Sequence, residues 1–312
     1  MPVNKDFYPI AGSSGAQSTG YTINQSIRFN DDDNAHMDRT PSSSGNRKIF
    51  TSSCWVKLGN INVNAPVGPG VSYGGVGSAG IVFGSDGAIT AYTYYTGSSW
   101  TGFLKTNRKF RDPSAWYHIV YTVDSTRSVA SERIRIYVNG VRETSFANEN
   151  YLAQDTDTNW NTSGAKMVIG RDPLDSSGYD MDGYLAEMHY LDGYSYGPEF
   201  FGEFDSNNIW IPKEYTGSYG TNGFFIDGRD SSDLGDDESG QGNDLTTSGL
   251  AAHDQVSDSP TNNFNTLNPL YETHAMTLSE GNLEGEGSNS SYRRIIGTQA
   301  VTSGKWYYEG RI

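Results

Sequence analysis

The sequence that decides the fold is Trp116-Tyr117-His118-Ile119-Val120-Tyr121-Thr122-Val123-Asp124, with the run that follows it, Arg133-Ile134-Arg135-Ile136-Tyr137-Val138. Both runs are rich in aromatic and β-branched residues, which favour strands. Asn139-Gly140 comes next and supplies the positive φ values that a two-residue hairpin turn requires. The turn leads into residues 141–144, so the stretch predicts two long strands and a tight hairpin.

Segments of the same kind occur on both sides of this stretch. Ile81-Val82-Phe83-Gly84 and residues 88–95 form a predicted hairpin around Ser85-Asp86-Gly87. Residues 59–80 are rich in Gly, Pro, Val and Asn and are predicted to be a long surface loop. The remaining predicted strands are residues 26–30, 49–57, 167–170 and 184–190. Many short strands separated by turns, with no convincing helix, predict an all-β jelly-roll sandwich.

The composition excludes some classes of protein. The chain has 312 residues, with 22 basic and 37 acidic side chains, and a net charge of −15. This charge argues against a nucleic-acid binder, because phosphate contacts need clustered Lys and Arg, and also against adhesion to an anionic membrane. High Gly (37 residues) and high Tyr (21 residues), with few aliphatic residues, describe a loop-rich β protein.

The sequence shows no targeting signal. No apolar run approaches the length of a membrane-spanning helix, so we expect no membrane insertion. The N-terminus, Met-Pro-Val-Asn-Lys-Asp-Phe-Tyr, lacks the apolar core of a secretory signal peptide. The single cysteine, Cys54, excludes an intrachain disulfide and is expected to be an inert buried thiol. We therefore expect a protein that is made and folded in a cytoplasm.

The same patterns divide the chain into four parts. Residues 1–23 are polar and form a predicted N-terminal arm, and residues 24–192 hold the sandwich. Residues 193–272 are predicted to be an extended acidic linker, because residues 227–258 carry nine acidic side chains and one basic side chain. Residues 273–312 are expected to begin a second β domain. Since the chain stops inside a strand-like segment, we expect the sequence to be the front of a longer protein.

Several segments together resemble the laminin-G-like branch of the concanavalin A-like lectin and glucanase fold. They are residues 26–29, 50–57, 116–120, 135–140, 169–171 and 182–188, in this order and spacing. Trp55 and Trp116 lie in these segments, and a Trp in a strand fills a thick sandwich core. The resemblance implies a concanavalin A-like jelly roll.

Other segments resemble structural proteins of tailed phages that contain this domain. They are residues 111–118, 201–204, 210–213, 220–224 and, most particular of all, 259–269, Ser-Pro-Thr-Asn-Asn-Phe-Asn-Thr-Leu-Asn-Pro. In such proteins this linker precedes a β-sandwich of the SPRY type, and residues 303–309 resemble its opening strand. The resemblance implies a virion fibre, spike or adhesin subunit rather than a free enzyme.

Glycoside hydrolysis is the first enzymatic activity to consider, because relatives of the fold include glucanases. Retaining enzymes need two carboxylates about 5–5.5 Å apart, and the sequence lacks the Glu-x-Asp-x-x-Glu run of the laminarinase type. Glu187 is a lone acid among apolar neighbours, expected to face a partner chain or to make a structural hydrogen bond. His118 and His189 lie in predicted strands and are expected to be packed there. We therefore predict that the chain is not an enzyme.

Calcium is the cofactor that the resemblance suggests, because laminin-G-like domains often bind one ion at a loop rim. Calcium prefers six to eight oxygen ligands from carboxylates and carbonyls. One acidic cluster is Asp31-Asp32-Asp33-Asn34. The favoured cluster brackets a Gly-containing loop between two predicted strands and consists of Asp172, Asp175, Asp180 and Asp182. The alternative is a solvated acidic loop.

Two further groups of residues are predicted to make contacts. Sugar rings stack on exposed Tyr and Trp side chains, and the predicted carbohydrate-binding residues are Tyr92, Tyr94, Tyr95 and Trp100. The alternative places these residues in the core on one face and in an interface on the other. The predicted subunit contact is a basic stretch on an otherwise acidic protein, with Lys105, Arg108, Lys109 and Arg111. Its alternative is a solvated loop.

The sequence therefore predicts a structural and adhesive subunit of a phage virion, made in the host cytoplasm. Its expected partners are other virion proteins, further copies of the same chain (a trimer is the working guess) and a host-surface glycan. Residues 1–23 are the predicted attachment to the virion. The alternatives are a carbohydrate-binding module or polysaccharide-active enzyme, and a capsid decoration protein.

Overall fold

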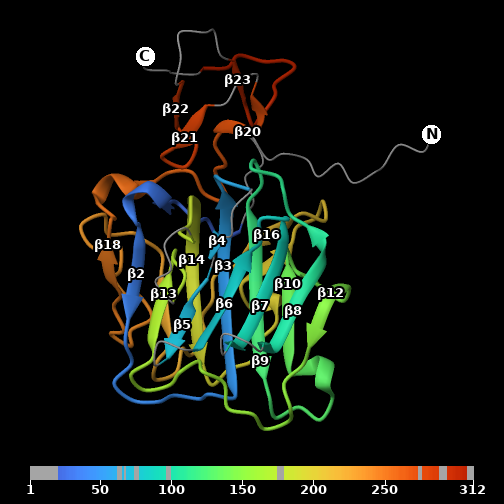
Figure 1. Ribbon diagram of the computed structural model, residues 1–312. Coiled ribbons are helices and arrows are strands. Elements are labelled where there is room, and N and C mark those ends of the chain that lie inside the picture. The colour runs from blue at the N-terminus through green and yellow to red at the C-terminus, as the bar shows by residue number, and fades with distance from the viewer. Residues whose placement is uncertain are drawn as a thin grey trace, which may run out of the picture.

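The computed structural model describes residues 20–61, 65–66, 68–73, 77–95, 100–173, 179–272, 276–287 and 294–307. In this part of the chain, two antiparallel β-sheets face each other and a small β module follows them (Figure 1). The helices of the described residues are single 3-10 turns, η1 (Asp31–Asp33), η2 (Ala130–Glu132), η3 (Pro198–Phe200) and η4 (Ala252–Asp254). None of these turns has the length and hydropathy needed to cross a membrane. The all-β prediction is confirmed.

The first sheet has eight strands within the described residues. Its order is β11-β10-β9-β3-β14-β1-β19, and β17 also pairs with β14. The strands are β1 (Ser26–Phe29), β3 (Ile49–Leu58), β9 (Tyr117–Asp124), β10 (Ile134–Val138), β11 (Val141–Arg142), β14 (Gly183–Asp192), β17 (Phe224–Ile226) and β19 (Gln255–Val256). The predicted hairpin joins β10 to β11, with φ values of 48° at Asn139 and 79° at Gly140.

The second sheet has nine strands in the same described ranges. Its order is β12-β8-β7-β6-β5-β13-β2-β18, and β4 pairs with β6. The strands are β2 (His36–Arg39), β4 (Ala65–Pro66), β5 (Gly70–Tyr73), β6 (Gly77–Phe83), β7 (Ala88–Tyr95), β8 (Trp100–Lys109), β12 (Phe146–Asn150), β13 (Lys166–Ile169) and β18 (Thr246–Ser248). The predicted hairpin between β6 and β7 is confirmed, with Phe83 opposite Ile89.

The predicted surface loop at 59–80 is wrong in its described part. Residues 65–66 and 70–73 are strands β4 and β5, and β6 begins at Gly77. The segment is rich in Gly and Val rather than in alternating apolar and polar residues, so it lacks the period-two signal by which a half-buried strand is found. Pairing of β5 with β6 and β13 holds it in the sheet.

The sandwich core lies between the sheets and is centred on stacked aromatic rings. Trp160 is fully buried, and its ring lies 4.9 Å from that of Phe50 and 5.8 Å from that of Tyr190. Trp160 comes from the connection between β12 and β13, not from a strand. The expectation that Trp55 and Trp116 fill this core is wrong. Both belong to a second cluster on the outer face of the eight-stranded sheet.

The predicted linker differs from the expectation, because it packs on the sandwich rather than extending from it. Its strand β17 pairs with β14, β18 pairs with β2, and β19 pairs with β1. Its aromatic side chains Phe201, Tyr215 and Tyr219 cover the outer face of the eight-stranded sheet. Burial of aromatic surface therefore overrides the acidic composition that predicted a solvated segment. The hairpin of β15 (Gly202–Phe204) and β16 (Trp210–Pro212) also belongs to this cover.

A small β module follows the linker and lies beyond one end of the sandwich (Figure 1). Its described residues form two antiparallel pairs. They are β20 (Leu267–Glu272) with β23 (Ile295–Gly297), and β21 (Thr277–Ser279) with β22 (Glu284–Glu286). The SPRY type of this module stays a prediction. Most of the predicted N-terminal arm lies outside the described residues.

Candidate functional site

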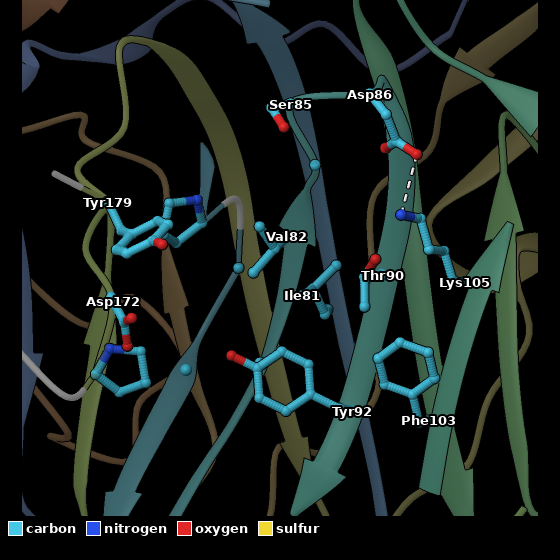
Figure 2. A pocket seen from close by; sticks show the side chains of 16 residues that line it. Ile81, Val82, Ser85, Asp86, Thr90, Tyr92, Phe103, Lys105, Asp172 and Tyr179 are labelled. Atoms are coloured by element: carbon cyan, nitrogen blue, oxygen red, sulfur yellow. Dashed lines mark ion pairs between the residues drawn. The ribbon is translucent and has the colours of Figure 1, made fainter. Parts of the chain in front are cut away.

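A cavity of about 510 Å³ lies on the outer face of the nine-stranded sheet. Strands β5 to β8 form its floor, the Ser85-Asp86 turn closes one end, and the ends of the β13–β14 connection form one wall (Figure 2). Its lining residues are Pro66, Gly68, Gly70, Gly80, Ile81, Val82, Gly84, Ser85, Asp86, Thr90, Tyr92, Phe103, Lys105, Asp172, Pro173 and Tyr179.

Glycines open this cavity. A Cβ atom at Gly80 would lie 3.4 Å from the Tyr92 hydroxyl, and one at Gly70 would lie 3.0 Å from Cδ of Pro173. Larger side chains at these two positions would therefore occupy the hollow above the sheet. Gly is otherwise unfavourable inside a strand, and it often marks the close approach of a ligand or of another backbone.

Aromatic rings stand on opposite sides of the cavity. Tyr92 and its cross-strand partner Phe103 lie side by side on the floor, while Tyr179 stands at the far wall (Figure 2). The Tyr179 side chain is well exposed, at 40%. Ring faces of this kind offer flat apolar surfaces next to polar hydroxyls, which suits the stacking of a sugar ring.

The rim of the cavity is charged. The carboxylate of Asp86 lies 2.7 Å from Nζ of Lys109 and 3.0 Å from Nζ of Lys105. Hydrogen bonds from these two ammonium groups, Lys109 first, hold the pKa of Asp86 well below its usual range. Asp86 therefore stays ionised at neutral pH, and it cannot act as a general acid there.

The cavity brings together members of all three groups singled out in the sequence. Tyr92 comes from the predicted carbohydrate site, Lys105 from the predicted subunit contact and Asp172 from the predicted calcium site. For the other predicted carbohydrate residues the structure gives backbone placement alone. Tyr95 of β7 pairs with Trp100 of β8, and Tyr94 pairs with Thr101.

Each basic side chain of the predicted subunit contact has an intramolecular partner. Lys105 and Lys109 share Asp86, and Arg111 donates to the Asp86 carbonyl oxygen at 2.7 Å. Arg108 pairs with Glu143 at 3.0 Å and covers the ring of Phe110. The stretch thus braces the β6–β7 turn and the edge of β8. Its role in subunit contact stays a prediction.

The predicted calcium ligands do not converge in the described structure. Asp172 lines the cavity, and Asp180 accepts a hydrogen bond from Nε of Arg171 at 2.6 Å. Asp182 is almost fully buried elsewhere, near Gly59 and Gly281, and Asp175 lies outside the described residues. Across the described ranges, no group of three or more His, Cys, Asp or Glu side chains is arranged to hold a metal ion. These residues therefore do not fit a single calcium site, and calcium binding stays a prediction.

Asp182 is nevertheless an unusual carboxyl group. Its side chain is 3% exposed, and its Oδ1 atom has no hydrogen-bond partner. Burial, together with the negative charges of Asp31 and Asp32, raises the pKa of Asp182 to about 7. Near neutral pH the Asp182 carboxyl group is therefore about half protonated.

The buried histidines occupy the covered face of the eight-stranded sheet. Nδ1 of His118 accepts a hydrogen bond from Nε1 of Trp210 at 3.0 Å, so its proton is on Nε2 and is donated to Oγ of Ser53 at 2.8 Å. Burial lowers the pKa of His118 to about 3. His118 therefore cannot take a proton from Ser53, and this pair is structural. His189 stacks on Phe225 with ring centroids 4.3 Å apart.

Glu187 makes the structural hydrogen bond that was one of its two predicted roles. It accepts a hydrogen bond from the hydroxyl of Tyr21 and lies 3.6 Å from Nε2 of His189. Its φ of 48° accompanies a bulge in β14, where the register with β3 shifts between Ala186 and His189. The bulge turns this carboxylate toward the cover of the sheet.

Sequence analysis missed several residues of the cavity, namely Phe103, Tyr179, Asp86 and the glycines. Phe103 lies in β8, where most residues are polar and Trp100 is the other aromatic residue, and Tyr179 belongs to an irregular connection. The spacing of Gly70 and Gly80 carried a usable signal, since Gly within strands often marks close approach of a ligand.

Comparison with known proteins identifies the sandwich. A family model described as the concanavalin A-like lectin/glucanases superfamily matches residues 30–194, more than half of the chain. No curated protein sequence matches the chain.

Solved structures with a similar fold come from several organisms. A heptameric SAP-like pentraxin from Limulus polyphemus is 14% identical, with 57% of this chain and 80% of that chain covered and a TM-score of 0.39. A putative carbohydrate binding protein from Bacteroides ovatus is 15% identical, with 73% and 58% covered and a TM-score of 0.47. Domains LG4-5 of the mouse laminin alpha1 chain are 10% identical, with 67% and 48% covered and a TM-score of 0.39. These similarities concern the fold alone.

Proposed function

The chain belongs to the concanavalin A-like lectin/glucanases superfamily, and from this premise we propose that it binds a carbohydrate in the cavity on its nine-stranded sheet. The observation that carries the proposal is the arrangement of rings in this cavity. Tyr92 and Phe103 on the floor and Tyr179 on the wall offer stacking surfaces, and Lys105 and Asp86 offer groups for sugar hydroxyls (Figure 2).

The proposed activity is binding without hydrolysis. A retaining or inverting glycosidase needs a carboxylic acid that holds its proton near neutral pH. Asp86, at the rim of the cavity, is held in its ionised form by Lys109 and Lys105. This argument supports a lectin-like role over a polysaccharide-active enzyme, which is the alternative.

We further propose that the binding module serves a phage virion as a fibre or spike subunit, made in the host cytoplasm. The support is the resemblance of residues 259–269 and of the neighbouring segments to structural proteins of tailed phages. The strongly acidic composition, with a net charge of −15, suits a surface that does not adhere to nucleic acid. The partners are then other virion proteins, further copies of the chain and a host-surface glycan.

The binding proposal is tested by screening the chain on a glycan array and measuring the best glycan by calorimetry. Gly80→Val should weaken binding at least tenfold, because its side chain would fill the cavity and φ at Gly80 lies outside the left-handed region that excludes Val. Thr246→Val is the matched control, since it places the same Val side chain on β18 of the same sheet, outside the cavity. Equal binding by wild type and Gly80→Val would contradict the proposed site.

The virion proposal is tested by immunogold labelling of intact particles with antibody raised against the whole chain. Label on the tail or on projecting fibres would support an adhesive role. Label spread over the head would favour the decoration protein instead. Particles without label would contradict the virion assignment but would not affect the glycan-binding test.

A further inference from the structure

Lys57 is a fully buried lysine on the outer face of the eight-stranded sheet. It lies near the end of β3, and the connection between β19 and β20, residues 257–266, runs over it. We call this connection the strap. It contains much of the motif at 259–269 that the sequence singled out. The Lys57 side chain is 1% exposed, and that of Asp258 in the strap is 4% exposed.

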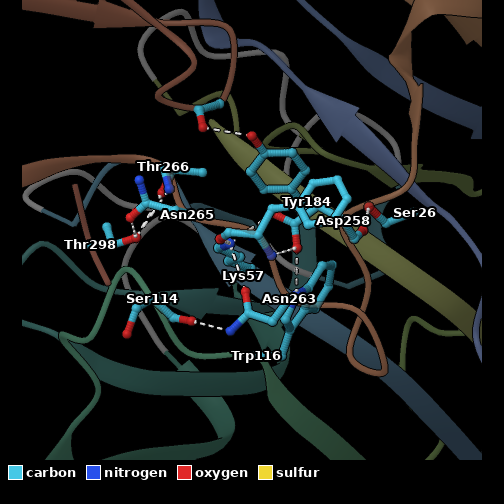
Figure 3. A network of polar contacts seen from close by, with 12 residues as sticks. Ser26, Lys57, Ser114, Trp116, Tyr184, Asp258, Asn263, Asn265, Thr266 and Thr298 are labelled. Atoms are coloured by element: carbon cyan, nitrogen blue, oxygen red, sulfur yellow. Dashed lines mark hydrogen bonds and ion pairs between the residues drawn. The ribbon is translucent and has the colours of Figure 1, made fainter. Parts of the chain in front are cut away.

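The amino group of Lys57 contacts the strap at three points (Figure 3). Its Nζ lies 2.7 Å from Oδ2 of Asp258, 2.8 Å from Oδ1 of Asn263 and 2.7 Å from the carbonyl oxygen of Phe264. Because a C=O bond is about 1.2 Å long, the Asn263 Cγ atom lies within about 4 Å of Nζ. A nucleophile and an amide carbon are thus almost in contact.

The Asn263 amide is held in one orientation. Its Nδ2 donates to the carbonyl oxygen of Ser114 at 2.7 Å, so Oδ1 faces Lys57. The opposite orientation would turn the NH2 group toward the donor Nζ and would lose both contacts. The amide carbon is therefore presented to the amine in a fixed geometry, which is the condition under which proximity accelerates a reaction.

Asp258 is positioned to move protons at this amine. Its Oδ1 accepts hydrogen bonds from Nε1 of Trp116 at 3.0 Å and from the Phe264 amide at 3.3 Å, while Oδ2 faces Lys57. Burial lowers the pKa of Lys57, which favours its neutral, nucleophilic form. Tyr184 adds an aromatic ring 5.7 Å from Nζ.

We propose that Lys57 and Asn263 form an intramolecular isopeptide bond, with Asp258 as the catalytic residue. The bond would join β3 of the sandwich to the strap, two positions that are 206 residues apart in the sequence. This activity is independent of glycan binding, since the cavity lies on the other sheet.

The reaction needs no oxidant, reductant or co-reactant. Asp258 takes one proton from the Lys57 ammonium, and the free amine forms a bond from Nζ to Cγ of Asn263. The Cγ–Nδ2 bond breaks as one proton passes from Nζ to Nδ2, which leaves as ammonia. Asp258 then returns its proton to the ammonia, so that an amide and one ammonium ion are the products.

Mass spectrometry of the purified full chain tests the bond. The expected result is an intact mass lower by one ammonia than the sequence requires. Trypsin should then fail to cut after Lys57, so that peptide 49–57 is lost and peptide 49–105 appears joined to peptide 230–293. Loss of ammonia at an Asn-Gly pair such as Asn139-Gly140 gives the same intact mass but leaves peptide 49–57 free.

Three variants complete the test. Lys57→Arg keeps the positive charge, Asn263→Ala removes the amide, and Asp258→Asn removes the proton acceptor. Each should show the free form of the strap peptide and no joined peptide. Recovery of peptide 49–57 in full yield from folded wild-type protein would overturn the proposal and leave Lys57 as a buried ion pair. Joining in Asp258→Asn at the wild-type level would overturn the role of Asp258.

Discussion

The outer faces of the two sheets are built from similar strands, but one face is open and the other is covered by the chain. On the nine-stranded sheet, small and aromatic residues leave an open cavity with an exposed ring at Tyr179. On the eight-stranded sheet, the outward residues Ser53, Trp55 and Lys57 are buried under the linker and the strap. In this sandwich one outer face is therefore covered by the chain itself, and the proposed binding cavity lies on the other face. The predictions below test this contrast.

The covered face should govern the pH dependence of stability through Asp182, which lies near Gly281 of the small module. Its pKa of about 7 in the folded state exceeds that of a free Asp, so the folded chain keeps a proton that the unfolded chain loses. The contribution is fully present below about pH 4 and is lost as the pH rises through 7, with a total on the order of 4 kcal/mol. Urea unfolding from about pH 4 to about pH 8 measures it.

Asp182→Asn is the control, and its free energy of unfolding should change less over this range. Calcium provides a further check. If the wild type is stabilised by calcium at about pH 8 and the variant is not, a cation binds this carboxylate. An equally steep pH dependence in the variant would contradict the role given to Asp182.

The acidic partners of the lysines on the two faces should differ in their contribution to stability. Asp258→Asn blocks the proposed bond and leaves the buried Lys57 ammonium without its counter-ion, so it should lower the free energy of unfolding by about 3 kcal/mol or more. Asp86→Asn breaks an exposed pair with Lys105 and Lys109 and should cost at most about 1 kcal/mol. Chemical denaturation of both variants measures these losses of stability. Equal losses would contradict the predicted difference between the two faces.

Aromatic residues on the covered face should also contribute more to stability than aromatic residues on the open face. Trp210→Ala removes a half-buried ring that stacks on His118 and donates a hydrogen bond to it, so we expect a loss of about 2 kcal/mol, somewhat less than for a fully buried Trp. The melting temperature should fall accordingly. An unchanged melting temperature would show that the cover is not bound to the sheet through this ring.

Tyr179→Ala, on the open face, should have the smallest effect on stability, within about 0.5 kcal/mol of wild type. Its expected effect is on binding, with an affinity for the glycan about tenfold lower, which corresponds to about 1.4 kcal/mol. Calorimetry of the variant with the best glycan measures this. Tyr271→Ala, which alters an exposed ring on the small module, is the matched control.

Much of the sandwich could be predicted from sequence because local residue patterns mark its strands. Period-two alternation and the Asn139-Gly140 turn located β3, β9, β10 and β11 without reference to any distant residue. Alternation tells which residues point to opposite faces, but not whether an outward face is covered. Trp55 was therefore assigned to the core, although it lies beneath the linker.

The candidate sites were harder to predict because they depend on distant contacts. Tyr92 was found as part of an aromatic cluster, whereas Tyr179 reaches the cavity from an irregular connection far along the chain. The contact between Lys57 and Asn263 spans 206 residues and leaves no local signal at either position. Acidic composition was misleading for the linker, since a few aromatic side chains decide where it packs.

One short segment, residues 246–256, supplies the last strand at one edge of each sheet. Its strand β18 pairs with β2, and its strand β19 pairs with β1. During synthesis on the ribosome, both edges stay open until this segment has emerged, and open edges are templates for aggregation. A fragment cut at residue 192 would keep them open permanently. We therefore expect the cooperative folding unit to extend beyond the family match at 30–194.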